Sequence, residues 1–358
     1  MSSTYGENLK LSIFGQSHSK AIGMTLDSIP AGSKVDFKAL QRFLARRSPG
    51  HSPLSTARHE ADKPEFLSGI VDGFTCGAPI AAIIENTDTK PQDYDAIADL
   101  PRPGHADLTA QIKYRGFQDT SGGGHFSGRL TAPLCIAGGL CLQWLEEMGI
   151  RIGAHIIQIG SKKAVRFDAL RPQLDRIGQI FPTLSAQSAE DFQQVIVAAQ
   201  AQGDSVGGRI ECAIVGLPAG LGGPMFGGIE GRLAQILYGI PAVKNVGFGR
   251  SEEFAGSFGS ESNDSFCLLD GAIVTETNNC GGILGGISTG MPVLFDVTFK
   301  PTPSIAKPQQ TVSFSRMENA TLTIQGRHDP CIVPRAVAVV EAAAAIAIYD
   351  MILGSSGK

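Results

Sequence analysis

The chain lacks the short motifs that identify several common classes of enzyme. It contains neither a Walker A sequence nor a strand-initiated G-x-G-x-x-G motif, which disfavours the common ATPase and Rossmann classes. The H-E-x-x-H motif of zinc peptidases and the G-x-S-x-G elbow of α/β-hydrolases are also absent. The histidines follow no familiar metal-ligand spacing, so we expect no bound metal ion.

Composition disfavours further classes of protein. The net charge of −4 offers no basic excess of the kind that nucleic-acid-binding proteins carry. The seven cysteines are odd in number and form no C-x-x-C pair, which disfavours zinc ribbons and disulfide frameworks and indicates a reducing, cytoplasmic setting. The first 30 residues contain no long apolar run, so we expect no signal peptide.

Long apolar runs are also scarce, and the longest covers residues 336–353. This stretch is mostly alanine and includes Glu341 and Asp350. A membrane span needs about 20 predominantly apolar residues. We therefore expect a buried or interface helix rather than a membrane span, and no membrane partner.

Glycine, in contrast, is abundant, with 44 residues of which many are clustered. Glycine is used where the backbone turns sharply or lies close to a ligand. A loop-rich architecture explains any single cluster equally well.

The pattern of apolar residues predicts a mixture of strands and helices. Strands are expected at 9–14, 24–29, 80–85, 152–159, 209–215, 293–299 and 321–324. Helices are expected at 36–47, with Asp36 as the N-cap, and at 126–148, 189–202, 228–238 and 334–352. Residues 86–124 are polar and rich in glycine and proline, which indicates long loops. Because there is no regular βαβ alternation and no evident linker, we expect one α+β domain over residues 1–358.

Two segments of the chain are weakly similar to each other. Residues 22–32 read IGMTLDSIPAG and residues 210–220 read IECAIVGLPAG, and a predicted helix follows each. A duplicated strand-turn-helix unit and chance explain this similarity about equally well.

Three polar clusters contain a histidine: GQSHS at 15–19, RPGHAD at 102–107 and GRHDPC at 326–331. Histidine titrates near neutral pH and can therefore give and take protons in the cell. We expect His18, His105 and Asp329 to handle protons at one site assembled from distant parts of the chain. A purely structural role is the alternative for each histidine taken singly.

A glycine-rich segment at 119–131 precedes a predicted helix and carries His125, Ser127 and Arg129. Exposed amides and the helix dipole make such a helix start suitable for an anion. The alternative is an ordinary turn before a core helix. The KPTPS segment at 300–304 offers further donors, although an ordinary strand exit explains it as well. The residues alone thus predict an enzyme that acts on an anionic small molecule by acid-base chemistry.

Taken together, these segments resemble the chorismate synthase family along nearly the whole chain. The matching segments are GQSHS (15–19), RRSPG (46–50), SGI (68–70), IENTD (84–88), RPGHAD (102–107), SGGGHFSGR (121–129), GDS (203–205), PAGLG (218–222), AVKNV (242–246), GGILGGIS (281–288), KPTPSI (300–305) and GRHDPC (326–331). The resemblance implies a β-α-β sandwich, in which antiparallel sheets pack with helices, and a cytoplasmic homotetramer.

The resemblance also implies a specific reaction. In this family 5-enolpyruvylshikimate 3-phosphate loses phosphate in a 1,4-anti elimination that yields chorismate, the last step of the shikimate pathway towards aromatic amino acids. Reduced FMN is required although no net redox change occurs. The chain shows no additional domain that could reduce flavin with NADPH, so we expect reduced FMN to come from an external source.

Roles for single residues follow from the same resemblance. His18 matches the histidine thought to protonate the departing phosphate, His105 the one thought to act on the flavin, and Asp329 an aspartate that assists proton removal. The positions expected to bind the cofactor are His125, Phe126, Ser127, Ala242, Gly285, Lys300, Thr302, Ser304 and Arg327. The positions expected to bind the substrate are Ser17, Arg47 and Arg129.

The positions that depart from the common family motifs include Gln16, Ser19, Ser48 and Ser121. Together these changes remove positive charge near a site for polyanions, and each lost charged contact costs about 1.5–3 kcal/mol if nothing compensates. We therefore expect an active enzyme with weaker substrate or flavin affinity.

Two other functions remain open at the level of sequence. One is a non-catalytic relative that binds FMN or a phosphorylated metabolite for regulation, against which the intact His18, His105 and Asp329 argue. The other is a metal-dependent phosphohydrolase that uses the same histidines.

Overall fold

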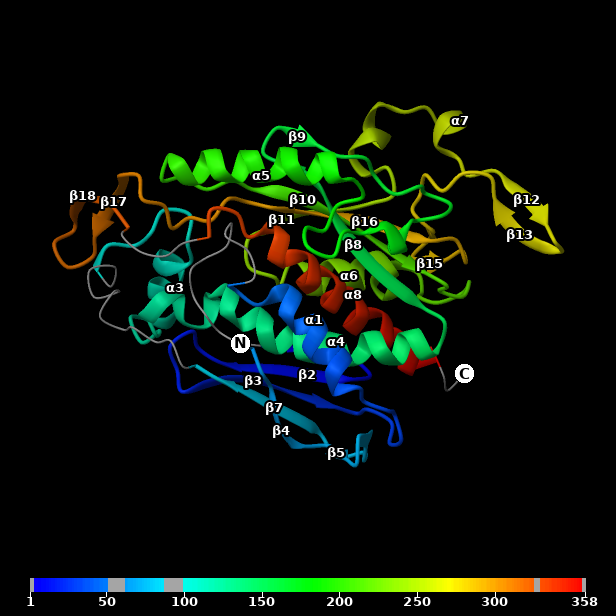
Figure 1. Ribbon diagram of the computed structural model, residues 1–358, viewed down its shortest axis with the longest axis horizontal. Helices are drawn as coiled ribbons and strands as arrows, with labels where there is room; N and C mark the ends of the chain where they lie inside the picture. The colour runs from blue at the N-terminus through cyan, green and yellow to red at the C-terminus, as the bar shows by residue number, and fades with distance from the viewer. Residues whose placement is uncertain (1–2, 51–61, 87–98, 325–328, 356–358) are drawn as a thin grey trace.

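The fold is a sandwich of two antiparallel sheets with helices between them (Figure 1). This computed structural model describes residues 3–50, 62–86, 99–324 and 329–355. Every pair of strands within these ranges is antiparallel. The α+β class and the β-α-β sandwich expected from the sequence are confirmed.

The first sheet is built from the N-terminal part of the chain. In spatial order its strands are β1 (Thr4–Tyr5), β2 (Lys10–Gly15), β3 (Ala21–Asp27), β7 (Ile80–Glu85) and β4 (Glu65–Ser68). Strand β7 alternates buried and less buried residues, and β3 does so except at the buried Gly23, so one face of this sheet meets the helices and the other faces outward.

The second sheet is built from the middle of the chain. In spatial order its strands are β11 (Val243–Phe248), β16 (Val293–Phe299), β10 (Gly208–Val215), β8 (Arg151–Ile159) and β9 (Lys162–Lys163). The central strands β10 and β16 are buried over most of their length. Helix α5 (Ala186–Ala201) covers the outer side of this sheet, where it packs against β8 and β9.

Three helices fill the space between the sheets: α1 (Phe37–Arg47), α4 (Thr131–Glu147) and α8 (Val333–Ser355). Helix α4 packs against β3 of the first sheet, and α8 packs against β8 of the second. Helix α6 (Ile229–Leu237) lies beside α8 and β11. The helices therefore join the two sheets through one continuous core.

The alanine-rich sequence of α8 explains its central position. Residues 342–348 are fully inaccessible to solvent, because small side chains let neighbours approach from all sides. At its crossing with α4, a Cβ added to Gly138 would lie 2.3 Å from the Cβ of Ala342, so only glycine fits there. By length and composition α8 could cross a membrane, yet 83% of its apolar stretch is buried inside the protein, as in a core helix.

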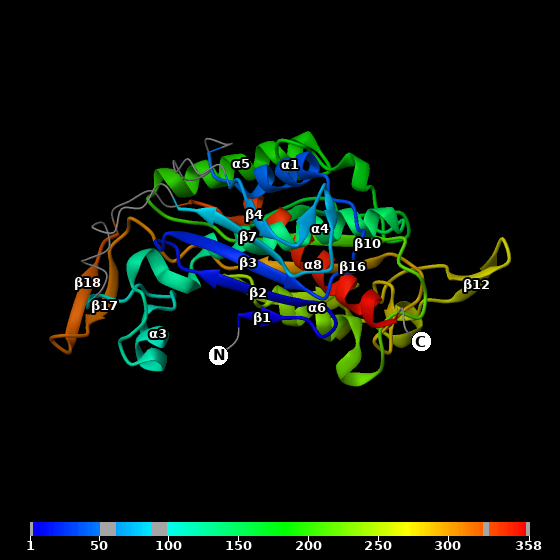
Figure 2. The same ribbon diagram turned by 90° about the horizontal axis from the view of Figure 1, so that it is seen from below.

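Smaller elements extend from both ends of the sandwich (Figure 2). Helix α3 (Asp107–Tyr114) and the hairpin of β17 (Gln309–Ser313) and β18 (Glu318–Leu322) lie at one end, and the hairpin of β12 (Phe266–Leu269) and β13 (Ala272–Thr275) projects from the other. The remaining elements are β5 (Ile70–Val71), β6 (Phe74–Thr75), β14 (Ile283–Leu284), β15 (Ile287–Ser288), α7 (Gly259–Ser262) and the 3-10 turns η2 (Ser121–Phe126), η3 (Gly128–Leu130), η4 (Leu174–Arg176), η5 (Met225–Gly227) and η6 (Ser251–Gly256).

All the predicted strands and helices correspond to observed elements, with ends displaced by a few residues. The prediction of long loops over residues 86–124 was wrong in part, because α3 lies within this range and η2 begins in it. Residues 87–98 of the same range lie outside the described residues. The two similar segments, 22–32 and 210–220, begin in β3 and β10, the middle strands of the two sheets. This equivalence favours duplication over chance as the origin of the similarity.

Candidate active site

A cavity of about 650 Å³ opens where several elements of the sandwich end. Its walls include the C-terminal end of α1, the N-terminal ends of α4 and α8, and the loop after β16. The N-terminus of a helix carries partial positive charge, so two of these elements favour an anion in the cavity.

Among the charged side chains that line the cavity in the described residues, basic ones outnumber acidic ones. The lysines and arginines among its lining residues are Arg47, Arg102, Arg129, Lys244, Lys300 and Arg335. Asp329 is the one carboxylate that lines it within the same part of the chain. A pocket with this excess of cations suits a ligand that carries several negative charges.

The glycine run at 122–124 separates the two candidate histidines. A Cβ added to Gly122 would lie 2.2 Å from Cε1 of His18, and one added to Gly123 would lie 3.1 Å from Nε2 of His105. Both glycines also have positive φ angles, 63° and 106°, which side chains rarely tolerate. Glycine is thus required here so that His18 and His105 can both approach the same loop closely.

The proton on the imidazole of His18 can be assigned from its neighbours. Oγ of Ser17 lies 2.8 Å from the carbonyl oxygen of Ser121 and 3.0 Å from Nδ1 of His18. A hydroxyl has one proton, and Ser17 donates it to the carbonyl, which can only accept. Ser17 therefore accepts from Nδ1 of His18.

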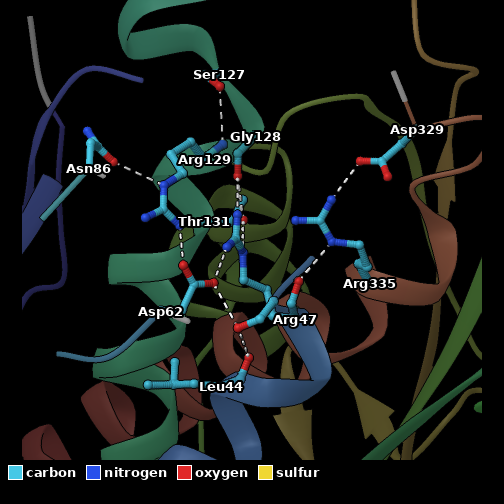
Figure 3. Close-up of polar contacts among 11 residues, drawn as sticks. Leu44, Arg47, Asp62, Asn86, Ser127, Gly128, Arg129, Thr131, Asp329 and Arg335 are labelled. Carbon is cyan, nitrogen blue, oxygen red and sulfur yellow. Dashed lines mark hydrogen bonds and ion pairs between the residues drawn. The ribbon is translucent and has the colours of Figure 1, made fainter. Parts of the chain in front are cut away.

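Asp62 binds two arginines of the cavity at once (Figure 3). Its two carboxylate oxygens form ion pairs with Nη1 of Arg47 and Nη1 of Arg129. Asp62 is 1% exposed, and the arginines are 3% and 6% exposed. Burial opposes ionisation of Asp62, but the charges of Arg47 and Arg129 outweigh it and hold its pKa below the ordinary value.

Further hydrogen bonds fix each of these arginines. Nε of Arg47 donates to Oγ1 of Thr131 (3.1 Å), and Nε of Arg129 donates to Oδ1 of Asn86 (3.2 Å). Since both side chains line the cavity, their orientation is set before a ligand binds.

Asp329 lies on the other side of this arrangement, where it pairs with Arg335 (Figure 3). Nη1 of Arg335 lies 2.6 Å from Oδ2 of Asp329, and Nε donates to the carbonyl oxygen of Arg47 (2.8 Å). Burial, only partly offset by Asp329, lowers the pKa of Arg335. Arg335 thereby connects the start of α8 to the end of α1.

A third wall of the cavity carries donors from the loop after β16. Nζ of Lys300 donates to the carbonyl oxygen of Gly104 (2.6 Å). Burial, reinforced by the nearby charge of Lys244, lowers the pKa of Lys300. Oγ1 of Thr302 is buried and has no hydrogen-bond partner in the described part of the protein. A bound anion would satisfy this hydroxyl and relieve the repulsion between the two lysines.

Most of the residues predicted for the site come together at this cavity. Lining it are His105, Asp329, His125, Phe126, Ser127, Ala242, Lys300, Thr302, Ser304, Arg47 and Arg129. His18 and Ser17 lie directly behind the glycine run. Gly285, in contrast, lies in the turn between β14 and β15 and does not line the cavity, and Arg327 lies outside the described residues.

Several charged side chains of the site were missed by sequence reasoning as functional groups, namely Asp62, Arg102, Asp107, Lys244 and Arg335. Asp107 could have been chosen, because it lies two residues after His105 in the RPGHAD segment. Asp62 lies in a segment with no distinctive pattern, and only the fold brings it to Arg47 and Arg129.

The positions that depart from the family motifs have defined contacts in the structure. Oγ of Ser48 lies 3.0 Å from the carbonyl oxygen of Leu44 and from Oδ2 of Asp62 and can donate to either. Oγ of Ser19 donates within the turn, where the amide of Gln16 in turn donates to it (2.9 Å). Ser121 contributes its carbonyl oxygen to Ser17. Neither Ser48 nor Ser121 supplies a charge in the place of an arginine.

Comparison with known proteins gives a consistent result. A sequence model of the chorismate synthase family matches residues 9–353. The chorismate synthase of Pyrococcus abyssi is 46% identical over 348 residues, which cover 97% of this chain and 97% of that protein. The chorismate synthase of Korarchaeum cryptofilum is 43% identical over 356 residues, covering 98% and 97%. A crystal structure of chorismate synthase superposes with a TM-score of 0.78 and 28% identity, covering 99% of this chain and 94% of the other.

The match extends over nearly the full length of the chain and includes both sheets and the helices between them. It also includes the basic cavity and the two histidines beside the glycine run. This chain is a member of the chorismate synthase family.

Proposed function

We propose that the chain converts 5-enolpyruvylshikimate 3-phosphate to chorismate by 1,4-anti elimination of phosphate, with reduced FMN bound and without net redox change. The observation that carries this proposal is a cavity rich in Arg and Lys that is lined by His105 and by a glycine of the run that His18 contacts. Substrate and cofactor both carry phosphate, and the substrate carries two carboxylates as well. A site for both must therefore supply cations and proton-transfer groups within the same small volume.

The residues present fit FMN. Lys300, the buried hydroxyl of Thr302 and the hydroxyl of Ser304 offer donors to its phosphate and ring carbonyls, and Phe126 offers an aromatic face. His125 is held by the carbonyl oxygen of Gly15, which lies 2.7 Å from its Nδ1. When bound, the reduced flavin supplies electron density to the substrate and recovers it. Gly285 and Arg327 remain predicted cofactor contacts.

The proton-transfer groups have separate roles in this reaction. His18 in its imidazolium form gives its Nε2 proton to the departing phosphate, while Ser17 retains the proton on Nδ1. Arg47 and Arg129 hold the anionic groups of the substrate. Asp329 carries a carboxylate that can assist removal of the ring proton, and Arg335 keeps it at the wall of the cavity. His105, which lies against Gly123 and lines the cavity, acts on the flavin.

The setting of the enzyme is part of the same proposal. We expect a homotetramer in the cytoplasm that receives reduced FMN from other proteins able to oxidise NADPH. This arrangement would place the chain in the shikimate pathway, which leads to the aromatic amino acids.

An anaerobic assay tests the proposal. Purified protein is mixed with 5-enolpyruvylshikimate 3-phosphate and dithionite-reduced FMN, and the absorbance of chorismate is followed. We expect chorismate with reduced FMN and none with oxidised FMN. Tight flavin binding without chorismate would instead favour the regulatory binding protein, and loss of phosphate release on addition of a chelator would favour the phosphohydrolase.

A further inference from the structure

Asp107, the first residue of α3, forms a compact polar group with the side chain of His105. Its Oδ1 lies 2.5 Å from Nδ1 of His105. Arg102 binds the same carboxylate at two points, with Nε 2.7 Å from Oδ2 and Nη2 2.7 Å from Oδ1. The backbone amide of Arg102 also donates to Oδ2 (2.9 Å). These contacts leave the carboxylate little freedom to turn.

The contacts determine which nitrogen of His105 carries the proton. Nη2 of Arg102 lies 3.0 Å from Nδ1, and Arg102 can only donate. If Nδ1 accepted from Arg102, two acceptors would face each other at 2.5 Å, namely Nδ1 and the carboxylate of Asp107. The contact between Nδ1 and Oδ1 of Asp107 is the shorter of the two, and a separation of 2.5 Å requires a proton between these atoms. Nδ1 is therefore the protonated nitrogen.

The carboxylate itself is ionised in this arrangement. Burial opposes ionisation of Asp107, but the hydrogen bonds from Arg102 and His105 outweigh it and hold its pKa well below the ordinary value. An ionised carboxylate has no proton to offer, which again assigns the shared proton to the imidazole.

The opposite edge of the ring lies against the glycine run beside the cavity, which His105 itself lines. A Cβ added to Gly123 would lie 3.1 Å from both Cε1 and Nε2 of His105, so this edge lies against the glycine run. Lys300 holds the turn before His105 through its bond to the carbonyl oxygen of Gly104. With the proton on Nδ1, the neutral ring presents the lone pair of Nε2 on this side.

We propose that Asp107 is the positioning residue of His105, fixing the proton on Nδ1 so that Nε2 is left as an acceptor at the glycine run beside the cavity. Arg102 secures this geometry by holding the carboxylate at two points. The assignment of the proton rests on the contacts alone, and its effect on catalysis rests on the proposed elimination reaction. In Ser-His-Asp hydrolases the change of the aspartate to asparagine leaves the wrong tautomer and lowers kcat about 10⁴-fold.

The test compares the wild type with Asp107→Asn by NMR of protein labelled with ¹⁵N-histidine, at a pH where the imidazole is neutral. His105→Asn identifies the signals of His105 by their loss. We expect ¹⁵N shifts of the Nδ1–H tautomer in the wild type and of the Nε2–H tautomer in Asp107→Asn, because the new amide can donate to Nδ1. An Nε2–H tautomer in the wild type, or the same tautomer in both proteins, would overturn the proposal.

Kinetics supply the second measurement. We expect Asp107→Asn to lower kcat about 10²- to 10⁴-fold with little change in KM. Asp107→Glu, which retains a carboxylate, should recover part of that loss. A purely structural role at the start of α3 would leave the tautomer unchanged.

Asp36→Asn is a matched control. Asp36 also receives backbone amides at the start of a helix, from Lys38 (2.8 Å) and Ala39 (2.9 Å), and contacts no histidine in the described part of the chain. The Asp36→Asn substitution should change neither the tautomer of His105 nor kcat. If the wild type formed no chorismate, the proposed function would fail while the NMR result still decided the role of Asp107.

Discussion

Replacing Asp62 by asparagine tests whether this buried carboxylate holds the two arginines of the cavity. The substitution keeps the size of the side chain but removes the charge that Arg47 and Arg129 share. Removing one partner of a buried ion pair costs about 3–5 kcal/mol, because the remaining charge is left uncompensated. Since all three side chains are nearly inaccessible to solvent, we expect the free energy of unfolding to fall by about 3 kcal/mol or more.

The loss of unfolding free energy caused by Asp62→Asn should depend on pH in a definite direction. The folded pKa of Asp62 lies below its unfolded value of about 3.9, so its stabilising effect is complete above that value. The effect is lost as pH falls through the folded pKa. The difference in unfolding free energy between the wild type and Asp62→Asn should therefore be constant near neutral pH and shrink in strong acid.

Chemical denaturation in the presence and absence of inorganic phosphate provides the assay. Phosphate can replace the missing carboxylate, so it should stabilise Asp62→Asn more than the wild type. Asp175→Asn is the control, because Asp175 pairs with Arg151 on the surface, where such pairs contribute about 0–1 kcal/mol. An Asp62→Asn protein within 1 kcal/mol of the wild type, and equally stabilised by phosphate, would refute the reasoning.

Other substitutions test separate parts of the account. Asp350→Ala removes the carboxylate that accepts from the amides of residues 7, 8 and 9, and should cost about 3 kcal/mol of unfolding free energy by denaturation. Gly123→Ala should lower kcat on the order of 100-fold in the anaerobic assay, because its Cβ displaces His105. Thr302→Val should leave the melting temperature unchanged but weaken FMN binding about 5-fold in a fluorescence titration, since only the ligand would satisfy that hydroxyl. An unchanged flavin affinity would contradict that assignment.

Local sequence predicted the buried elements well. The strands β7 and β16 were predicted with both ends correct, because each is a short, mostly apolar run bounded by polar or turn residues, although β16 includes Asp296. Asp36 was correctly identified as the N-cap of α1, where its carboxylate accepts from two backbone amides.

Elements that depend on distant partners were harder to predict. Strand β11 was not predicted, because its pairing with β16 depends on a strand about 50 residues later in the chain. Helix α3 was missed because it is short and lies in a polar segment rich in glycine and proline.

Local sequence also does not reveal the parts of the functional site that depend on residues far apart in the chain. The histidines and glycines of the site lie in recognisable local patterns, and the fold brings most of them to one cavity. The aspartates that hold the basic groups are different, because a carboxylate acquires such a role only through its spatial neighbours. Asp62 contacts Arg129 across 67 positions of the chain, and no local pattern indicates that contact.

The most direct test of the central claim is the source of oxygen in the released phosphate. The reaction is run anaerobically with reduced FMN in water enriched in ¹⁸O, and the phosphate is analysed by mass spectrometry. Elimination breaks the carbon–oxygen bond of the substrate, so we predict unlabelled phosphate in amounts equal to chorismate. Phosphate that carries ¹⁸O from water, released without chorismate, would show hydrolysis and contradict the account.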